Sequence, residues 1–139
     1  MQNTTNHIKR ELQLTADGSH TLFIPEMDEH YHSVNGAVQE SRHVFIEAGL
    51  HHLERREITI LEIGFGTGLN AFLTLLDAEA CQRKIHYCSI ELYPLGTDVI
   101  ESLNYGEMLC AGRKDVFHAL HQAEWNVAVQ VTEFFELHK

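Results

Sequence analysis

The sequence has no long hydrophobic run, only three cysteines and no Cys-x-x-Cys pair. No apolar stretch approaches the roughly 20 residues that cross a bilayer, which excludes a spanning helix and a membrane partner. The polar N-terminus, residues 1–10, lacks the apolar core of a secretory signal, so we expect a cytoplasmic protein. Cys81, Cys88 and Cys110 are expected to be buried thiols in a reducing compartment, not a disulfide framework or a zinc knuckle.

Positive charge is also scarce. Ten Lys and Arg residues stand against twenty Asp and Glu residues, a formal net charge of −10 with histidine neutral. The basic residues of the middle region, such as Arg42, Arg55 and Arg83, are scattered and form no stripe. This balance argues against nonspecific nucleic-acid binding, which depends on Lys and Arg neutralising phosphates.

The length of 139 residues indicates a single domain, 1–139, with no linker or repeat. In its N-terminal part, residues 8–24 alternate around an Asp-Gly pair and predict a β-hairpin that ends at Pro25. Residues 26–39 are polar, and a loop of this length is typical of a lid or a ligand-contacting segment. Ser41 is expected to cap a helix that runs to Arg55 or Arg56.

The second part, residues 58–139, alternates between strand-like and helix-like segments, which predicts an α/β fold with a parallel sheet. Its first strand is almost continuously apolar and is expected to be buried on both faces. The expected strands are 58–63, 85–90, 127–131 and 134–137, and the expected helices are 69–80, 95–103 and 115–122, the last capped by Asp115.

A glycine-rich turn, Gly64-Phe65-Gly66-Thr67-Gly68, lies between the first of these strands and its helix. Glycine permits positive φ angles and lets a ligand approach the backbone, and the following helix start offers free N–H groups. Glu62 precedes the turn, and Glu91 ends the second strand, where a carboxylate can accept hydrogen bonds from both ribose hydroxyls. The alternative is a tight turn that binds nothing.

Several ligands can be weighed for this turn. The dinucleotide pattern Gly-x-Gly-x-x-Gly fails at Leu69, and from Gly66 it would need Ala71 in its last place, which some dinucleotide folds tolerate. The carboxylate of Glu62 would repel a pyrophosphate but can pair with the amino group of a methionine moiety. A Walker phosphate loop is excluded, because no Gly-Lys-Ser/Thr follows.

Two other groups of residues have ordinary explanations. Asp28, Glu29, His30 and His32 include good metal ligands, but they lack a fixed spacing to a third ligand, so we expect no metal site. The aromatic side chains of the C-terminal part are expected to pack in the core and not to stack on a base. These are Trp125, Phe134 and Phe135.

The pattern Glu62-x-Gly64-x-Gly66-x-Gly68 followed by Glu91 resembles class I methyltransferases. The longer runs GFGTGLNAFLTLL, PEMDEHYHS, GAVQESRHVFI and IELYPL resemble the methyltransferase module of the bacterial MnmC family, over residues 15–139. The resemblance implies a Rossmann-like class I methyltransferase sheet, of which this chain holds the N-terminal hairpin and the first, cofactor-binding half.

For function, the resemblance implies methylation of the amine of 5-aminomethyl-2-thiouridine at the tRNA wobble position. The cofactor would be S-adenosyl-L-methionine, with tRNA as the substrate and a flavin-dependent oxidase as a fused domain or partner. The implied cofactor-binding residues are Glu62, Gly64, Phe65, Gly66, Thr67, Gly68, Asn70 and Glu91, with Tyr31, Ser33 and Glu40 in the loop that folds over the cofactor or the base.

The sequence departs from that family in one respect. The family's acidic Asp-Ala/Gly-Phe-x-Pro motif does not occur, so we expect a truncated chain whose catalytic acid lies beyond Lys139, with little activity alone. An unpaired sheet edge would then favour self-association. The alternatives are a class I methyltransferase acting on a small molecule or protein, which the net charge favours, and a non-catalytic nucleotide-binding module.

Overall fold

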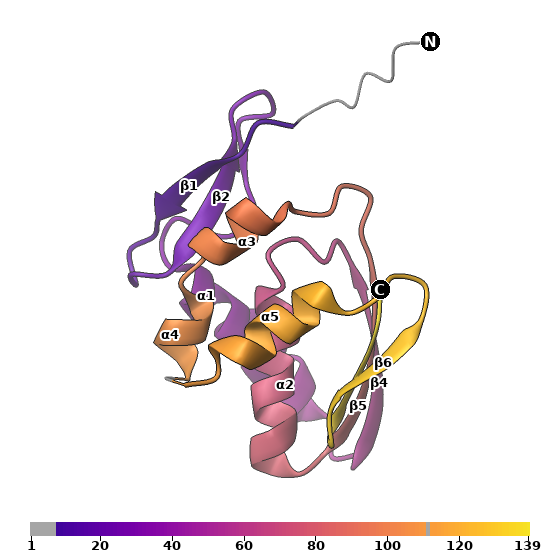
Figure 1. Ribbon diagram of the computed structural model, residues 1–139. Coiled ribbons are helices and arrows are strands. Elements are labelled where there is room, and N and C mark those ends of the chain that lie inside the picture. Colours follow the sequence, from indigo (N-terminus) through magenta and orange to yellow (C-terminus); the bar gives the residue numbers. More distant parts are fainter. Residues whose placement is uncertain (1–7, 111) are drawn as a thin grey trace.

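The computed structural model describes residues 8–110 and 112–139, which form two β-sheets and the helices packed against them (Figure 1). The first sheet has three strands, in the order β1 (Glu11–Leu14), β2 (His20–Ile24), β3 (Glu29–His30). The second has four, in the order β4 (Glu57–Ile63), β5 (Lys84–Ile90), β7 (Phe135–His138), β6 (Ala128–Thr132). Residues 1–7, which belong to the polar start used above, lie outside the described residues. Within the described residues, no helix has the length and apolar character needed to cross a membrane.

The predicted hairpin is confirmed. β1 (Glu11–Leu14) and β2 (His20–Ile24) pair antiparallel, and β2 ends immediately before Pro25. A third strand, β3 (Glu29–His30), pairs with the free edge of β2 in a segment that was expected to be a loop. Two residues of pairing leave too short a pattern in the sequence for a strand to be predicted there.

The predicted helix start at Ser41 is wrong. The cap position is Gly36, five residues earlier, and the helix is α1 (Ala37–Ser41). It starts there because side chains of the hairpin turn accept hydrogen bonds from its first N–H groups. The N–H groups of residues 37, 38 and 39 donate to Thr15 Oγ1, Ser19 Oγ and Asp17 Oδ2 at 3.1, 3.1 and 2.9 Å. These caps lie about twenty residues away in the sequence, so no local pattern indicates them.

The helix also ends differently from the prediction. After α1 the chain continues as a π-helical segment, η1 (Arg42–Glu47), and a 3₁₀ turn, η2 (Leu50–His52). The segment therefore stops before Arg55. Of the predicted apolar face, Ile46 and Leu50 are buried, whereas Leu53 lies beyond the last turn and is 47% exposed.

The predicted strand–turn–helix–strand unit is confirmed as β4 (Glu57–Ile63), α2 (Leu69–Cys81) and β5 (Lys84–Ile90), with β4 and β5 parallel. β7 (Phe135–His138) extends this parallel sheet beside β5. The expectation that the strand at 127–131 is also parallel is wrong: β6 (Ala128–Thr132) pairs antiparallel with β7. The two residues between β6 and β7 allow only a hairpin, since a parallel crossover needs a dozen or more.

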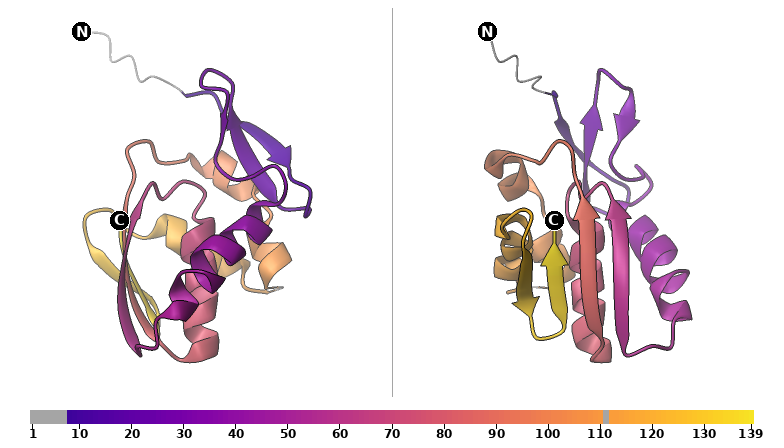
Figure 2. Two further views of the ribbon diagram at one scale, coloured as in Figure 1. Left: turned by 180° about the vertical axis from the view of Figure 1, so that it is seen from behind. Right: turned by 90° about the vertical axis from the view of Figure 1, so that its right-hand side faces the viewer.

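The prediction that the first strand is buried on both faces is wrong. Ile58 is buried beneath the helices, whereas Leu61 and Ile63 on the opposite face are 66% and 75% exposed. α2 and α5 (Lys114–Gln122) cover the same side of the sheet, and Figure 2 (right) shows the other side without a helix among the described residues. The open face therefore carries apolar side chains in contact with solvent.

Two short helices complete the fold. α3 (Thr97–Ser102) is shorter than predicted, and α4 (Tyr105–Leu109) was not predicted. Asp115 does not cap α5, because Arg113 occupies the cap position and Asp115 lies in the first turn. The core between the helices and the sheet includes packed aromatic rings. Phe117 lies 5.5 Å from Phe72 in a tilted arrangement and 5.8 Å from Tyr105 edge-on, between ring centroids.

Candidate functional site

The glycine turn lies where β4 ends, beside the end of the parallel strand β5. The Gly64 N–H donates to the Ile90 carbonyl at 2.7 Å, which ties the turn to the neighbouring strand. Gly64, Gly66 and Gly68 have φ angles of 89°, 55° and 74°, in the region that favours glycine. The three glycines predicted for a tight turn are therefore each required by the backbone.

The surroundings of these glycines differ. A Cβ at Gly64 would meet no atom within 4 Å, so the backbone there borders open space. A Cβ at Gly66 would lie 3.2 Å from Cδ2 of Tyr31, and one at Gly68 would lie 2.8 Å from Nε2 of His121. A ligand can thus approach the turn at Gly64, while protein side chains cover Gly66 and Gly68.

Glu91 points toward the turn. Its Oε2 accepts a hydrogen bond from the Gly66 N–H at 2.8 Å, and its Oε1 accepts one from the Tyr93 N–H at 2.8 Å. A carboxylate offers about four acceptor positions, so two of them are left for hydroxyl donors. The acid that was predicted from its position after the second strand lies directly against the glycine turn.

Glu62 lies on the other side of β4's end, under the start of α2. The Ser89 hydroxyl donates to Glu62 Oε1 at 2.8 Å, because parallel pairing makes these two residues direct partners. Burial raises the pKa of the Glu62 carboxyl, and hydrogen bonds from Tyr87, Ser89 and Asn70 act against that rise. Asn70 Oδ1 is buried with no hydrogen-bond partner among the described residues. Glu62 and Asn70 therefore have hydrogen-bond acceptor positions that the fold leaves free for a ligand.

Two predicted residues of the turn have side chains that point into the protein. Thr67 is 1% exposed and its Oγ1 lies 2.7 Å from His32 Nε2. The Phe65 ring is 5% exposed and packs edge-on against His121 at 5.3 Å. His121 Nε2 in turn lies 2.9 Å from the Thr67 carbonyl. A ligand in the turn would meet the backbone of Phe65 and Thr67, not their side chains.

The loop residues predicted to fold over the site are gathered beside it. Tyr31 lies against Gly66, and its hydroxyl accepts a hydrogen bond from Arg10 Nε at 2.9 Å. The Ser33 N–H donates to Glu40 Oε2 at 2.8 Å, so these two residues form one unit at the loop's end. The contact between His32 and Thr67 joins this loop to the turn.

Two cavities flank the end of β4. One, of about 440 Å³, has Glu62 and Asn70 in its wall beside a mainly apolar lining that includes Phe45 and Leu53. The other, also of about 440 Å³, has Glu91 in its wall together with Trp125. Both volumes lie within the range of small-molecule sites.

Arg10, Ser89 and His121 support the site and were missed in the sequence. Arg10 holds Tyr31 and also donates to the Tyr93 carbonyl at 3.0 Å, so it links the hairpin to the segment after β5. No local motif marks these residues, because each acts through a partner more than twenty positions away. Only the pairing of Ser89 with Glu62 could have been anticipated, from the register of adjacent parallel strands.

The residues weighed above as metal ligands do not converge. His30 Nε2 lies 3.0 Å from Gln13 Oε1, and His32 contacts Thr67. Of the aromatic residues, Phe135 is fully buried and Phe134 packs against the core, as expected. Trp125 is half-buried and lies beneath the Lys139 ammonium, 4.4 Å from the ring centroid.

Fold and site together define a Rossmann-like α/β protein with a glycine turn between two carboxylates at the ends of adjacent parallel strands. No protein-family model matches the sequence. Among curated proteins, the chain is 36% identical over 99 residues to the tRNA 5-methylaminomethyl-2-thiouridine biosynthesis bifunctional protein MnmC of Magnetococcus marinus, covering 67% of this chain and 14% of that protein. The namesake from Cupriavidus necator is 32% identical over 123 residues, covering 84% of this chain and 18% of that protein.

A solved structure agrees with these relatives. The crystal structure of MnmC2 from Aquifex aeolicus matches with a TM-score of 0.57 and 34% identity over 66% of this chain and 32% of that chain. The chain belongs to the MnmC family. It spans between 13% and 19% of the length of the curated relatives it matches.

Proposed function

We propose that this chain is the cofactor-binding part of an S-adenosylmethionine-dependent methyltransferase that modifies the wobble uridine of tRNA. The observation that carries the proposal is the position of Glu91, whose carboxylate lies 2.8 Å from the Gly66 N–H at the glycine turn. The name of the relatives, which refers to 5-methylaminomethyl-2-thiouridine biosynthesis, supports the tRNA substrate and the cytoplasm as its location.

The residues of the site fit this cofactor. Gly64 borders open space where a nucleoside can approach, and Glu91 keeps acceptor positions for two ribose hydroxyls. Glu62, with its raised pKa, is suited to pair with the ammonium group of the methionine moiety, since a nearby cation stabilises the charged carboxylate. Two carboxylates at one turn disfavour a dinucleotide pyrophosphate.

When bound, the cofactor supplies an electrophilic methyl group on a sulfonium. The chain's own contribution is to bind and orient it through Glu62, Glu91 and the turn backbone, and to cover it from the loop that holds Tyr31, Ser33 and Glu40. Holding the neutral amine of 5-aminomethyl-2-thiouridine in line with the methyl group, away from water, is the main requirement of such a transfer.

Titration calorimetry tests the cofactor. We expect S-adenosylmethionine to bind and NAD not to bind, and we expect Glu91→Gln to weaken S-adenosylmethionine binding by about tenfold, the loss expected for a charge-assisted hydrogen bond. Glu101→Gln, on the exposed side of α3, is the matched control and should leave binding unchanged. Binding of NAD without S-adenosylmethionine would refute the proposal and favour the nucleotide-binding module.

The net charge of −10 favours a second candidate, a methyltransferase acting on a small molecule or protein. The two candidates can be separated by measuring the transfer of a labelled methyl group to undermodified tRNA and, in parallel, to a fraction of proteins and small molecules. The relatives' name includes the word bifunctional, so those proteins have a second activity. For the tRNA enzyme, a flavin-dependent oxidase as a fused domain or partner is proposed on the family resemblance alone.

We also propose that the chain self-associates through β4. Among the described residues β4 pairs only with β5, so its other edge has free backbone groups, and Leu61 and Ile63 beside that edge are exposed. Sedimentation analysis should show a concentration-dependent dimer that Leu61→Lys weakens. A monomer at all concentrations would exclude it.

A further inference from the structure

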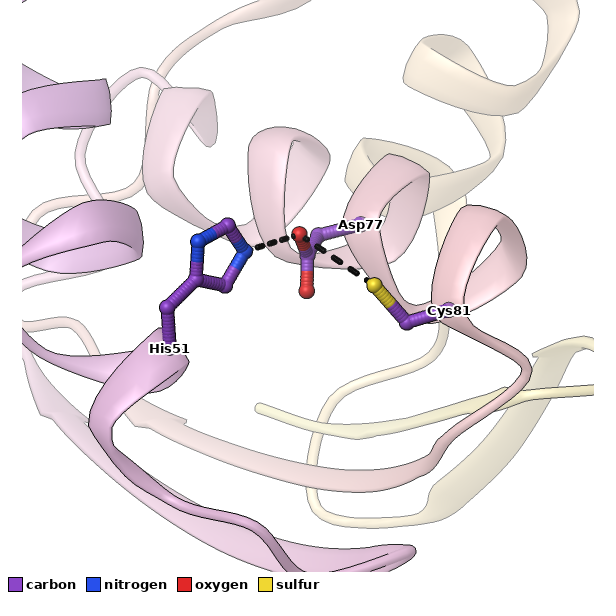
Figure 3. A group of neighbouring side chains, drawn as sticks. All are labelled: His51, Asp77 and Cys81. Atoms are coloured by element: carbon purple, nitrogen blue, oxygen red, sulfur yellow. Dashed lines mark hydrogen bonds and ion pairs between the residues drawn. The ribbon is translucent and has the colours of Figure 1, made fainter.

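Three side chains with good metal-binding atoms converge on a surface remote from the glycine turn (Figure 3). His51 comes from η2, while Asp77 and Cys81 are one turn apart on α2 and therefore face the same way. His51 Nε2 lies 2.6 Å from Asp77 Oδ1, and Cys81 Sγ lies 3.9 Å from the same oxygen. All three donor atoms are within 4.8 Å of one another.

The cluster has unused binding capacity. Asp77 Oδ2 is buried without a hydrogen-bond partner among the described residues, while His51 and Cys81 are accessible from solvent. One alternative function for the cluster is a nucleophilic cysteine. That function would need the His51 imidazole next to the Cys81 thiol, so that the imidazole could accept the thiol proton. Here the carboxylate lies between them, and a negative charge beside the sulfur opposes thiolate formation. A cation would satisfy all three groups at once.

We propose that His51, Asp77 and Cys81 bind a zinc ion, with water as the fourth ligand. One nitrogen, one oxygen and one sulfur donor is a set that zinc accepts, at distances of about 2.0 to 2.3 Å in a tetrahedron. Such a tetrahedron separates the donor atoms by roughly 3.3 to 3.7 Å. The distance from Cys81 Sγ to Asp77 Oδ1, 3.9 Å, is already close to this range. The distance from His51 Nε2 to Asp77 Oδ1, 2.6 Å, would have to increase by less than about 1 Å, which the exposed His51 ring allows.

The site would join two elements that the sequence keeps apart. His51 and Asp77 are 26 positions apart, so the sequence contains no short metal-ligand motif that would predict this site. Three arginines line the same surface pocket: Arg55, Arg56 and Arg83. The Arg83 guanidinium donates to the Leu53 carbonyl at 2.7 Å. Bound zinc would fasten η2 to the last turn of α2, the helix that begins at the glycine turn. This function does not depend on the proposed methyl transfer.

The test uses the full chain, reduced and freed of metal, titrated with zinc and with cobalt. We expect one ion per chain, a thiolate-to-cobalt charge-transfer band, and binding that strengthens as pH rises because the thiol must lose its proton. In the unchanged protein, zinc should protect Cys81, and not Cys110, from alkylation detected by mass spectrometry. This readout needs no variant and therefore no assumption about folding.

Variants assign the ligands. We expect His51→Gln and Cys81→Ser each to weaken zinc binding by at least tenfold and to abolish the zinc-dependent rise in Tm. His52→Gln, on the adjacent exposed histidine, and Cys110→Ser are the matched controls and should bind as the unchanged chain does. No saturable binding, or binding that Cys110→Ser removes and Cys81→Ser does not, would overturn the proposal.

Discussion

The carboxylate of Glu91 accepts the N–H of Gly66 across a distance of 2.8 Å. Gly66 has a φ of 55° and its N–H points out of the β4–α2 turn, toward the end of β5. The same side chain therefore fixes the shape of the turn and presents the acid that we assign to a ribose. Structural and binding roles of Glu91 must be separated by experiment.

Two substitutions at Glu91 make that separation. Glu91→Ala removes the partner of the Gly66 N–H and should lower the free energy of unfolding by about 1–3 kcal/mol, the usual cost of losing a hydrogen bond to a charged group. Glu91→Gln retains an acceptor and should cost less, while still weakening ligand binding. Urea unfolding of both variants measures the difference, and equal destabilisation by the two would contradict the structural role.

The glycines of the turn should respond differently to alanine. Gly64→Ala and Gly66→Ala each force a Cβ into a positive-φ conformation, at a cost of about 1–2 kcal/mol. Gly66→Ala should cost more, because its Cβ would press on Tyr31 at 3.2 Å, whereas the Gly64 Cβ enters open space. Gly64→Ala should instead impair S-adenosylmethionine binding, by occupying the approach to the turn.

Gly112 supplies the control for these substitutions. It has a φ of 87° and open space around it, so Gly112→Ala carries the same backbone cost outside the site. Thermal unfolding and calorimetry on the three variants are sufficient. If Gly64→Ala bound the cofactor as tightly as Gly112→Ala does, the inference that the ligand approaches the turn at Gly64 would be wrong.

Thr67 is expected to act on stability and not on ligand affinity. Thr67→Val keeps the shape but removes the hydroxyl that contacts His32 Nε2 at 2.7 Å inside the protein. Leaving that half-buried nitrogen without its partner should cost about 1 kcal/mol. Among folded molecules, S-adenosylmethionine binding measured by calorimetry should be unchanged, and a tenfold loss would show that the side chain reaches the ligand after all.

Stability should fall on acidification because of two half-buried histidines, His32 and His121. Burial lowers the pKa of His32 and of His121 to about 4, from the usual 6.5. Between these values the unfolded chain binds more protons than the folded one, so the stability from each neutral imidazole is complete above pH 6.5 and is lost as the pH falls toward 4. The loss amounts to up to about 3 kcal/mol for each residue.

His121→Gln tests this dependence. The amide can still donate to the Thr67 carbonyl, as His121 Nε2 is placed to do at 2.9 Å, but it does not titrate. Urea unfolding from pH 7 to pH 4 should therefore show a shallower loss of stability in this variant. The exposed His52→Gln should follow the unchanged chain, and parallel curves for all three proteins would assign the acid sensitivity to other groups.

Local patterns in the sequence were sufficient for the elements that depend on neighbours in the chain. The Asp-Gly pair predicted the β1–β2 hairpin, and the glycine turn predicted the β4–α2–β5 unit, because turn residues and short-range periodicity act within a few positions. The positions of Glu62 and Glu91 at the ends of adjacent parallel strands followed from the same unit, and the family resemblance was also visible.

The tertiary structure alone decided what depends on distant partners. The start of α1 is set by caps from Thr15, Asp17 and Ser19, the direction of β6 by its pairing with β7, and the open sheet face by helices that gather on one side. Thr67 was expected beside a ligand, but His32, 35 positions away, binds its hydroxyl. Hydrogen bonds and burial between remote segments form only once the chain is packed, so no window of sequence contains them.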